Sequence, residues 1–138
     1  LPQHPGFVRG TIADNVRVVA PQASDDEVLD ALRLAGADFV DSLPDGIYSV
    51  LGERGSGLSV GQRQRIALAR VIVRKTRVLM LDEPTAGLDG VTERAVVQTI
   101  DDLSRGRTVL LVAHRPALAA TADRTVVVLP PQGGDGDA

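Results

Sequence analysis

The sequence contains no cysteine and no tryptophan, and its aromatic residues are one tyrosine and two phenylalanines. Without cysteine the chain can form neither disulfides nor thiolate metal sites, which fits a reducing compartment. With so few aromatic side chains, we expect no base-stacking platform for nucleic acid and a core built from Val, Leu, Ile and Ala. The longest apolar runs, such as residues 109–113, are far too short to span a bilayer.

The sequence also lacks an excess of basic residues. Its net charge is -3 and its isoelectric point is about 5.3, and no basic cluster is visible along the chain. Nucleic-acid binders usually carry such a cluster, so we expect no nucleic-acid partner. The 138 residues are 43% hydrophobic, which predicts one globular domain at most.

Periodic patterns predict an α/β fold. Ser24 followed by Glu27 is a capping box, which predicts a helix that ends near Gly36. A second short helix is expected at 37–42, and Ser59 is expected to cap a long helix at about 60–73. Apolar runs then predict buried strands at 78–81, 108–113 and 125–129, alternating with helices at about 92–104 and 116–122. This order predicts a mostly parallel sheet preceded by a mostly helical part.

Two adjacent carboxylates, Asp82 and Glu83, follow the first of these strands. In open α/β sheets, ligands bind beyond the carboxyl ends of the strands. Neighbouring side chains there point to different sides, so one carboxylate can hold Mg²⁺ while the other takes a proton from an attacking water. A solvated acidic turn at a strand end would give the same two residues, and this pattern alone does not separate the two readings.

Ser59 and Gly61 stand at the start of the predicted helix at 60–73. A helix N-terminus presents free backbone N–H groups and the positive end of the helix dipole, both of which favour a phosphate. Gly61 has no side chain and would let a ligand approach the backbone closely. A serine cap beside a small residue is common on ordinary helices, so this signal also needs support from its neighbours.

Together these segments resemble the ATP-binding cassette (ABC) ATPases. Residues 58–70 (LSVGQRQRIALAR) are similar to the family's signature, although Val60 stands where the family most often has glycine. Residues 82–89 (DEPTAGLD) resemble its Walker B motif and D-loop, and residues 111–115 (LVAHR) resemble its switch region. Gln3 and the residues after it, including Gly10, Thr11, Ile12 and Asn15, are similar to its Q-loop segment.

The resemblance implies a role for each matching residue. Glu83 would polarise the lytic water and His114 would steady the γ-phosphate, which makes them the candidate catalytic residues. Asp82 and Gln3 would hold Mg²⁺, partly through water. The candidate ATP-contacting residues are Gln3, Ser59, Gly61, Gln62, Asp82 and Asp89, of which Ser59 and Gly61 would contact the ATP of a partner. Asp89 would lie between two such domains, although a helix N-cap explains an aspartate there equally well.

The family's phosphate-binding loop, Gly-x-x-x-x-Gly-Lys-Ser/Thr, is absent from this sequence. Its only lysine, Lys75, follows Val73 and Arg74 rather than a glycine loop. By the resemblance, the chain is a partial P-loop NTPase (RecA-like) core with the ABC α-helical subdomain. Residues 1–73 would hold the Q-loop, the helical subdomain and the signature helix, residues 74–129 the core, and residues 130–138 a disordered tail. Because Leu1 comes first and Met80 is the only methionine, we expect the true N-terminus to be missing.

Residues 51–55 (LGERG) resemble the X-loop of exporter-type cassettes, in which Glu53 and Arg54 would contact a membrane domain. Residues 43–46 and 106–118 are similar to those of the bacterial cysteine/glutathione exporters that serve cytochrome bd assembly, and parts of them occur in many other exporters. The resemblance implies ATP-driven transport, with ATP and Mg²⁺ bound between two cassettes arranged head to tail. Transmembrane domains, in the same full-length chain, would place the cassettes at the cytoplasmic face of the cell membrane.

Two other interpretations stay open from the sequence. The chain could be a truncated or remnant cassette without ATPase activity, and the missing phosphate loop favours this. It could also be a soluble cassette protein that acts on nucleic acid, and its acidic charge argues against that.

Overall fold

The computed structural model describes residue 1 and residues 5–128, so the predicted site residue Gln3 and the predicted tail at 130–138 lie outside it. The first half is mostly helical, with one small antiparallel pair of strands. Its elements are β1 (Gly10–Thr11), α1 (Ile12–Arg17), α2 (Asp25–Leu34), the 3₁₀ helices η1 (Asp38–Ser42), η2 (Gly46–Tyr48) and η3 (Glu53–Gly55), β2 (Val50–Leu51) and α3 (Val60–Val73). The second half alternates strands and helices: β3 (Val78–Asp82), α4 (Gly90–Ser104), β4 (Thr108–Val112) and α5 (Pro116–Ala119).

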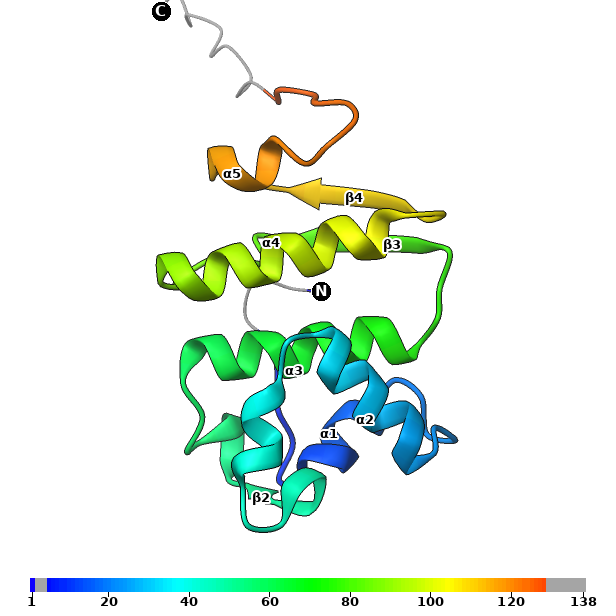
Figure 1. Cartoon of the computed structure of the whole chain (residues 1–138), viewed down its shortest axis with the longest axis vertical. Coiled ribbons are helices and arrows are strands. Elements are labelled where there is room, and N and C mark those ends of the chain that lie inside the picture. The colour runs from blue at the N-terminus through cyan, green and yellow to red at the C-terminus, as the bar shows by residue number, and fades with distance from the viewer. Residues whose placement is uncertain (2–4, 129–138) are drawn as a thin grey trace, which may run out of the picture.

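Helix α3 runs through the middle of the molecule (Figure 1). Helices α1 and α2 lie on one side of it, and β3, β4, α4 and α5 lie on the other. A single buried cluster joins both sides, with Ile66, Leu68 and Ile72 of α3 among its members. The predicted α/β fold with a small parallel sheet is confirmed.

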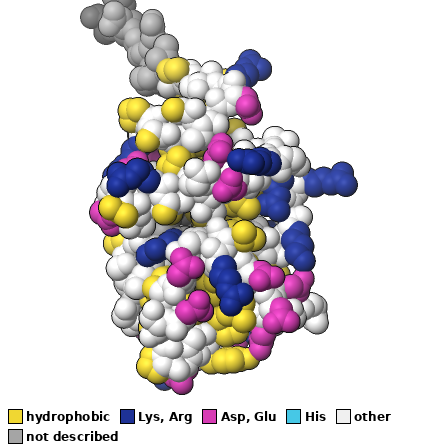
Figure 2. Space-filling model, in the orientation of Figure 1, with side chains coloured by type: hydrophobic (Ala, Val, Ile, Leu, Met, Phe, Trp, Pro, Cys, Tyr) yellow, Lys and Arg dark blue, Asp and Glu magenta, His cyan; other side chains and the backbone are white. Residues whose placement is uncertain are grey.

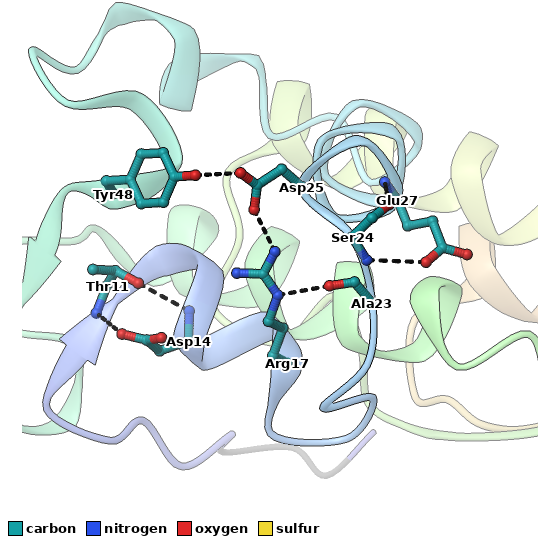
Figure 3. Close-up of polar contacts among 8 residues, drawn as sticks. All are labelled: Thr11, Asp14, Arg17, Ala23, Ser24, Asp25, Glu27 and Tyr48. Carbon is teal, nitrogen blue, oxygen red and sulfur yellow. Dashed lines mark hydrogen bonds and ion pairs between the residues drawn. The ribbon is translucent and has the colours of Figure 1, made fainter.

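Local capping explains where several helices begin. Thr11, Ser24 and Ser59 each accept a hydrogen bond from the backbone N–H three residues on, and the side chain of that third residue bonds back to the cap. Two of these capping boxes are visible in Figure 3, at the starts of α1 and α2. The same view shows Arg17 joining the two helices, because its guanidinium bonds to the carbonyl of Ala23 and to the carboxylate of Asp25. The boxes at Ser24 and Ser59 confirm the predicted helix starts.

The sheet of β3 and β4 is parallel, and Met80 lies opposite Leu110 and Asp82 opposite Val112. One face is buried, with Leu79 and Leu81 in the core, and α4 lies across it (Figure 1). The other face is open among the described residues, where Met80 is 65% and Leu110 56% exposed. The expectation that these strands are fully buried was therefore wrong, since the described part of the chain supplies helices for one face only.

A predicted third strand is also absent. Residues 125–128 have no strand structure, and Val126, Val127 and Val128 are exposed. A run of β-branched residues has strand propensity, but a strand also needs a neighbouring backbone to pair with, and none of the described residues pairs with this run. Among the described residues, no helix combines the length and the apolarity that crossing a membrane requires.

Candidate functional site

Two of the predicted site residues meet where β3 and β4 end. Parallel pairing places the carboxyl ends of both strands at one edge of the sheet, and the N–H of Glu83 donates to the carbonyl of Val112 at 3.0 Å. His114 follows β4 by two residues, and its Nε2 lies 3.0 Å from Oε1 of Glu83. The imidazole is 82% exposed and the carboxylate 25% exposed, so the pair sits at a surface with the carboxylate on the inner side.

The backbone at Glu83 takes an unusual conformation. Its φ angle is +42°, in the left-handed region that non-glycine residues rarely adopt. Such a conformation costs on the order of 1 kcal/mol and persists where the surroundings fix it. Here the N–H is held by Val112, and the carbonyl accepts from the N–H of Ala86 at 3.0 Å. The strand end therefore turns sharply and directs the Glu83 carboxylate towards His114.

A cavity of about 250 Å³ adjoins the pair. It is lined by Glu83, Thr85, Ala86, Gly87, Ala113, His114, Arg115 and Leu118. On one wall, Arg115 forms an ion pair with Glu93 in the first turn of α4, which fixes that helix to the segment after β4. The cavity has the carboxylate and the imidazole at its edge, which suits a reaction that needs a proton acceptor and a donor to an anion.

Asp82 is the last residue of β3 and is exposed. Its N–H donates to the carbonyl of Leu1 at 2.9 Å, and the amino group of Leu1 bonds to the carbonyl of Met80. Leu1 therefore lies alongside β3, whereas Gln3 is outside the described residues. No group of three or more acidic or histidine side chains that could hold a metal occurs in the described ranges. Mg²⁺ needs no such group, because it usually keeps several waters and binds through one or two carboxylates plus substrate phosphates, and Asp82 can supply one of those carboxylates.

The N-terminus of α3 is built as predicted, with Ser59 as its cap. The Ser59 Oγ accepts from the N–H of Gln62 at 3.1 Å, and the Gln62 Oε1 accepts from the N–H of Ser59 at 2.9 Å. The hydroxyl oxygen is thus used as an acceptor while its proton can still be donated to an anion. Both side chains stay at the surface or partly exposed, so the end of the helix is accessible.

Gly61 also has a role in packing that the sequence did not predict. A Cβ at this position would lie 3.1 Å from Cγ2 of Thr92 and 3.6 Å from Cδ2 of Leu88. One residue earlier, Cγ1 of Val60 would be 3.4 Å from a Cβ on Gly87. The first turn of α3 therefore packs against the loop that leads from Glu83 into α4, and the absent side chain makes room for Thr92.

Asp89 acts as the N-cap of α4. Its carboxylate accepts from the backbone N–H groups of Val91 and Thr92, both at 3.0 Å, and from the Thr92 hydroxyl at 2.9 Å. The hydrogen bond from the Thr92 N–H, followed by that from the Thr92 hydroxyl, lowers the pKa of Asp89 below its ordinary value. The sequence left open whether Asp89 is a helix N-cap or a contact between two domains, and the structure shows the N-cap.

Comparison with known proteins shows which family this chain belongs to. A family model described as "ABC transporter" matches residues 1–86. The cyclolysin secretion/processing ATP-binding protein CyaB of Bordetella pertussis is 45% identical over 126 residues, which are 91% of this chain and 17% of CyaB. The chain belongs to the ABC transporter family. The mycobactin import ATP-binding/permease protein IrtB of Mycobacterium bovis is 46% identical over 127 residues, which are 91% of this chain and 22% of IrtB.

A solved structure agrees with these ABC transporter relatives. The structure of a bacterial Atm1-family ABC exporter with ATP bound superposes with a TM-score of 0.77 at 38% identity, and the match covers 88% of this chain and 21% of that chain. The predicted likeness to ABC exporters is confirmed. The chain spans less than a quarter of CyaB, IrtB and this exporter, so it covers only part of an ABC cassette.

The sequence did not predict that Arg70 and Asn15 contact each other near the signature helix, although the position of Arg70 on that helix was a sign of a partner. In the predicted helix at 60–73, Arg70 falls at helical spacing with Ile66 and Val73 on one apolar face, where a charged side chain is unexpected. In the structure it bonds to Asn15, which is fully buried near the end of α1. A charged residue at a core position of a helix indicates a partner elsewhere in the chain, but the pattern does not say which one.

Proposed function

We propose that this chain is the part of an ABC exporter cassette that carries the catalytic carboxylate, and that it couples ATP binding and hydrolysis to transport. The observation that carries the proposal is the contact between Glu83 and His114 at the ends of two parallel strands, beside a cavity. On this proposal Glu83 polarises the attacking water and His114 steadies the transferred γ-phosphate. Asp82, with Gln3, would hold Mg²⁺, which supplies charge neutralisation for the phosphates.

The signature end of the chain has a different proposed ligand. The capped N-terminus of α3 carries Ser59 and Gly61, with Gln62 in the capping box, and suits the phosphates of ATP held by a second cassette. We propose a head-to-tail dimer in which Asp89 lies near the partner. The segment at Glu53 and Arg54 is exposed, which supports its proposed contact with transmembrane domains at the cytoplasmic face of the cell membrane.

On this proposal residues 1–73 form the Q-loop segment, helical subdomain and signature helix, and residues 74–129 form the core. No nucleic-acid partner is proposed: on the face shown in Figure 2, acidic and basic side chains are interspersed rather than gathered into a basic stripe. The isolated chain is proposed to be inactive, because the sequence contains no phosphate-binding loop. The likeness of residues 43–46 and 106–118 to cysteine/glutathione exporters makes a small thiol compound the first cargo to test.

The decisive variant is Glu83→Gln in the complete transporter that carries this chain. The amide keeps the shape of the carboxylate but cannot accept the proton, so ATP turnover should fall roughly 10²- to 10⁴-fold while nucleotide affinity stays unchanged. Turnover and the nucleotide dissociation constant are measured on the same preparation. Glu27→Gln is the matched control, because Glu27 serves a capping box on α2.

Three outcomes separate the alternatives. Loss of turnover with retained nucleotide binding supports the proposed role of Glu83. Unchanged turnover in Glu83→Gln removes Glu83 from the reaction. A wild-type protein that neither binds nor hydrolyses ATP supports the rival function, a remnant cassette without activity.

A further inference from the structure

A buried amide near the end of α1 holds the segment that precedes β1. Asn15 is fully buried, and its Oδ1 accepts from the N–H of Val8 at 3.0 Å and from Nη2 of Arg70 at 2.9 Å. Its Nδ2 donates to the carbonyls of Val8 and Thr11, both at 3.0 Å. Two donor and two acceptor positions are therefore all used, which is the full capacity of an asparagine side chain.

Arg70 completes the connection from α3. Its Nε donates to the carbonyl of Asn15 at 2.8 Å, and its Nη1 donates to the carbonyl of Gly6 at 2.6 Å. The guanidinium also lies over the ring of Phe7, 4.5 Å from the ring centre. The arginine thus contacts Gly6, Phe7 and Asn15 at once, which only a planar fork of donors can do.

This arginine is not neutralised by an acid. Burial lowers the pKa of Arg70, and none of the ion pairs among the described residues involves it. A charge removed from water without a counter-ion is costly unless its donors are satisfied. Carbonyl oxygens, the Asn15 amide and the Phe7 ring satisfy them here. An apolar residue at this position would leave the carbonyls of Asn15 and Gly6 without these hydrogen bonds, so the guanidinium has a positional task.

The connection lies between the two elements that carry the proposed sites, α3 and β3. Arg70 lies on the helix whose N-terminus carries Ser59. The segment that it holds, Gly6 to Val8, follows closely on Leu1, which is bonded to β3 at Met80 and Asp82. Among the described residues, Leu1 is thus bonded to the strand that ends in Asp82, and Gly6 and Phe7 contact Arg70 on the signature helix.

We propose that Arg70 and Asn15 are positioning residues that set α3, and with it Ser59, relative to the strand end that carries Asp82 and Glu83. This inference rests on the proposed function. Neither residue lines the cavity beside Glu83 and His114, so their loss should change turnover more than nucleotide binding. A displacement of about 1 Å in a reacting geometry can reduce a rate about 100-fold.

The test uses Arg70→Lys in the complete transporter, which keeps the charge but loses the fork. We expect ATP turnover to fall at least 10-fold, with the nucleotide dissociation constant within about twofold of wild type. The exposed Arg74→Lys, at the end of the same helix, is the matched control and should match wild type. Hydrogen exchange of the Val8 amide, which is bonded to Asn15, should become faster in Arg70→Lys only.

The outcomes separate this inference from the proposed function. Wild-type turnover in Arg70→Lys overturns the positioning role, and so does a loss of turnover that merely follows the loss of folded protein. If Arg70→Lys does not fold, Asn15→Asp is measured instead, because aspartate can still pair with Arg70 but cannot donate to Val8 and Thr11. Absence of turnover in the wild type overturns the proposed function, and with it the effect of Arg70 and Asn15 on turnover. The Val8 exchange rate still shows whether Arg70 and Asn15 hold the segment at Val8.

Discussion

At the scale of single residues, the contact between α3 and α4 includes Gly61, where a side chain would be crowded by Thr92. Alanine favours a helix over glycine by about 1 kcal/mol, so propensity alone predicts that Gly61→Ala is stabilising. The 3.1 Å approach to Cγ2 of Thr92 opposes this gain, because that methyl would have to move by a few tenths of an ångström while the Thr92 hydroxyl is held by Asp89. Overpacking of this kind costs about 1–3 kcal/mol. The clash is therefore expected to outweigh the propensity.

We predict that Gly61→Ala lowers the free energy of unfolding by about 1 kcal/mol and that Thr92→Ser restores most of the loss. Serine removes Cγ2 but keeps the hydroxyl that bonds to Asp89. Denaturant unfolding of the wild type, both single variants and the double variant gives the coupling energy between the two positions. Additive effects would show that the two residues do not meet.

At the scale of elements, what could be predicted depends on how far apart the interacting residues lie. The caps of α2 and α3 were predicted because a cap is a local feature, a box of Ser24 and Glu27 in α2 and a single serine, Ser59, in α3. The hydrogen bonds between Asn15 and Arg70 were not predicted, because the two residues are 55 positions apart and no local pattern joins them. The run at 125–128 was assigned to a strand because periodicity records propensity but not the presence of a pairing neighbour.

For the site residues too, local features could be predicted and contacts between distant elements could not. Glu83 and His114 could be selected because residues 82–89 and 111–115 resemble family motifs, and parallel strands place the positions after them at one edge. The left-handed turn at Glu83 and the close packing around Gly61 arise from neighbours in other elements, so the sequence predicted neither. The role of Asp89 stayed open because a cap and a partner contact require the same residue type at that position.

We predict that stability depends on pH through Asp89, the N-cap of α4. The folded-state pKa of Asp89 is lowered, so its contribution to stability is present above the ordinary value of 3.8 and is lost as the pH falls through the lower folded value. Asparagine also caps helices well but does not titrate. Asp89→Asn should therefore lose less stability between pH 5 and pH 3 than the wild type, as measured by urea unfolding at each pH. Parallel losses in the two proteins would contradict a charged cap.

At the scale of the whole molecule, one buried cluster unites both halves, yet none of the described residues covers one face of the sheet. The open face of β3 and β4 carries Val78, Met80, Leu110 and Val112, all of which are exposed. Continuous apolar runs are typical of strands that are covered on both sides. The composition of the strands therefore suits a larger assembly than the described residues form, in agreement with a chain that covers only part of a cassette.

We predict that the isolated 138-residue chain self-associates through this face. A contiguous apolar surface on a sheet gains free energy when a second copy covers it, so the sedimentation coefficient should rise with protein concentration. The double variant Met80→Thr with Leu110→Thr should abolish that rise, because threonine keeps strand propensity while making the face polar. Leu34→Thr is the matched control, since Leu34 is 61% exposed but lies on α2. Association that persists in the double variant, or that disappears in the control, would place the contact elsewhere on the molecule.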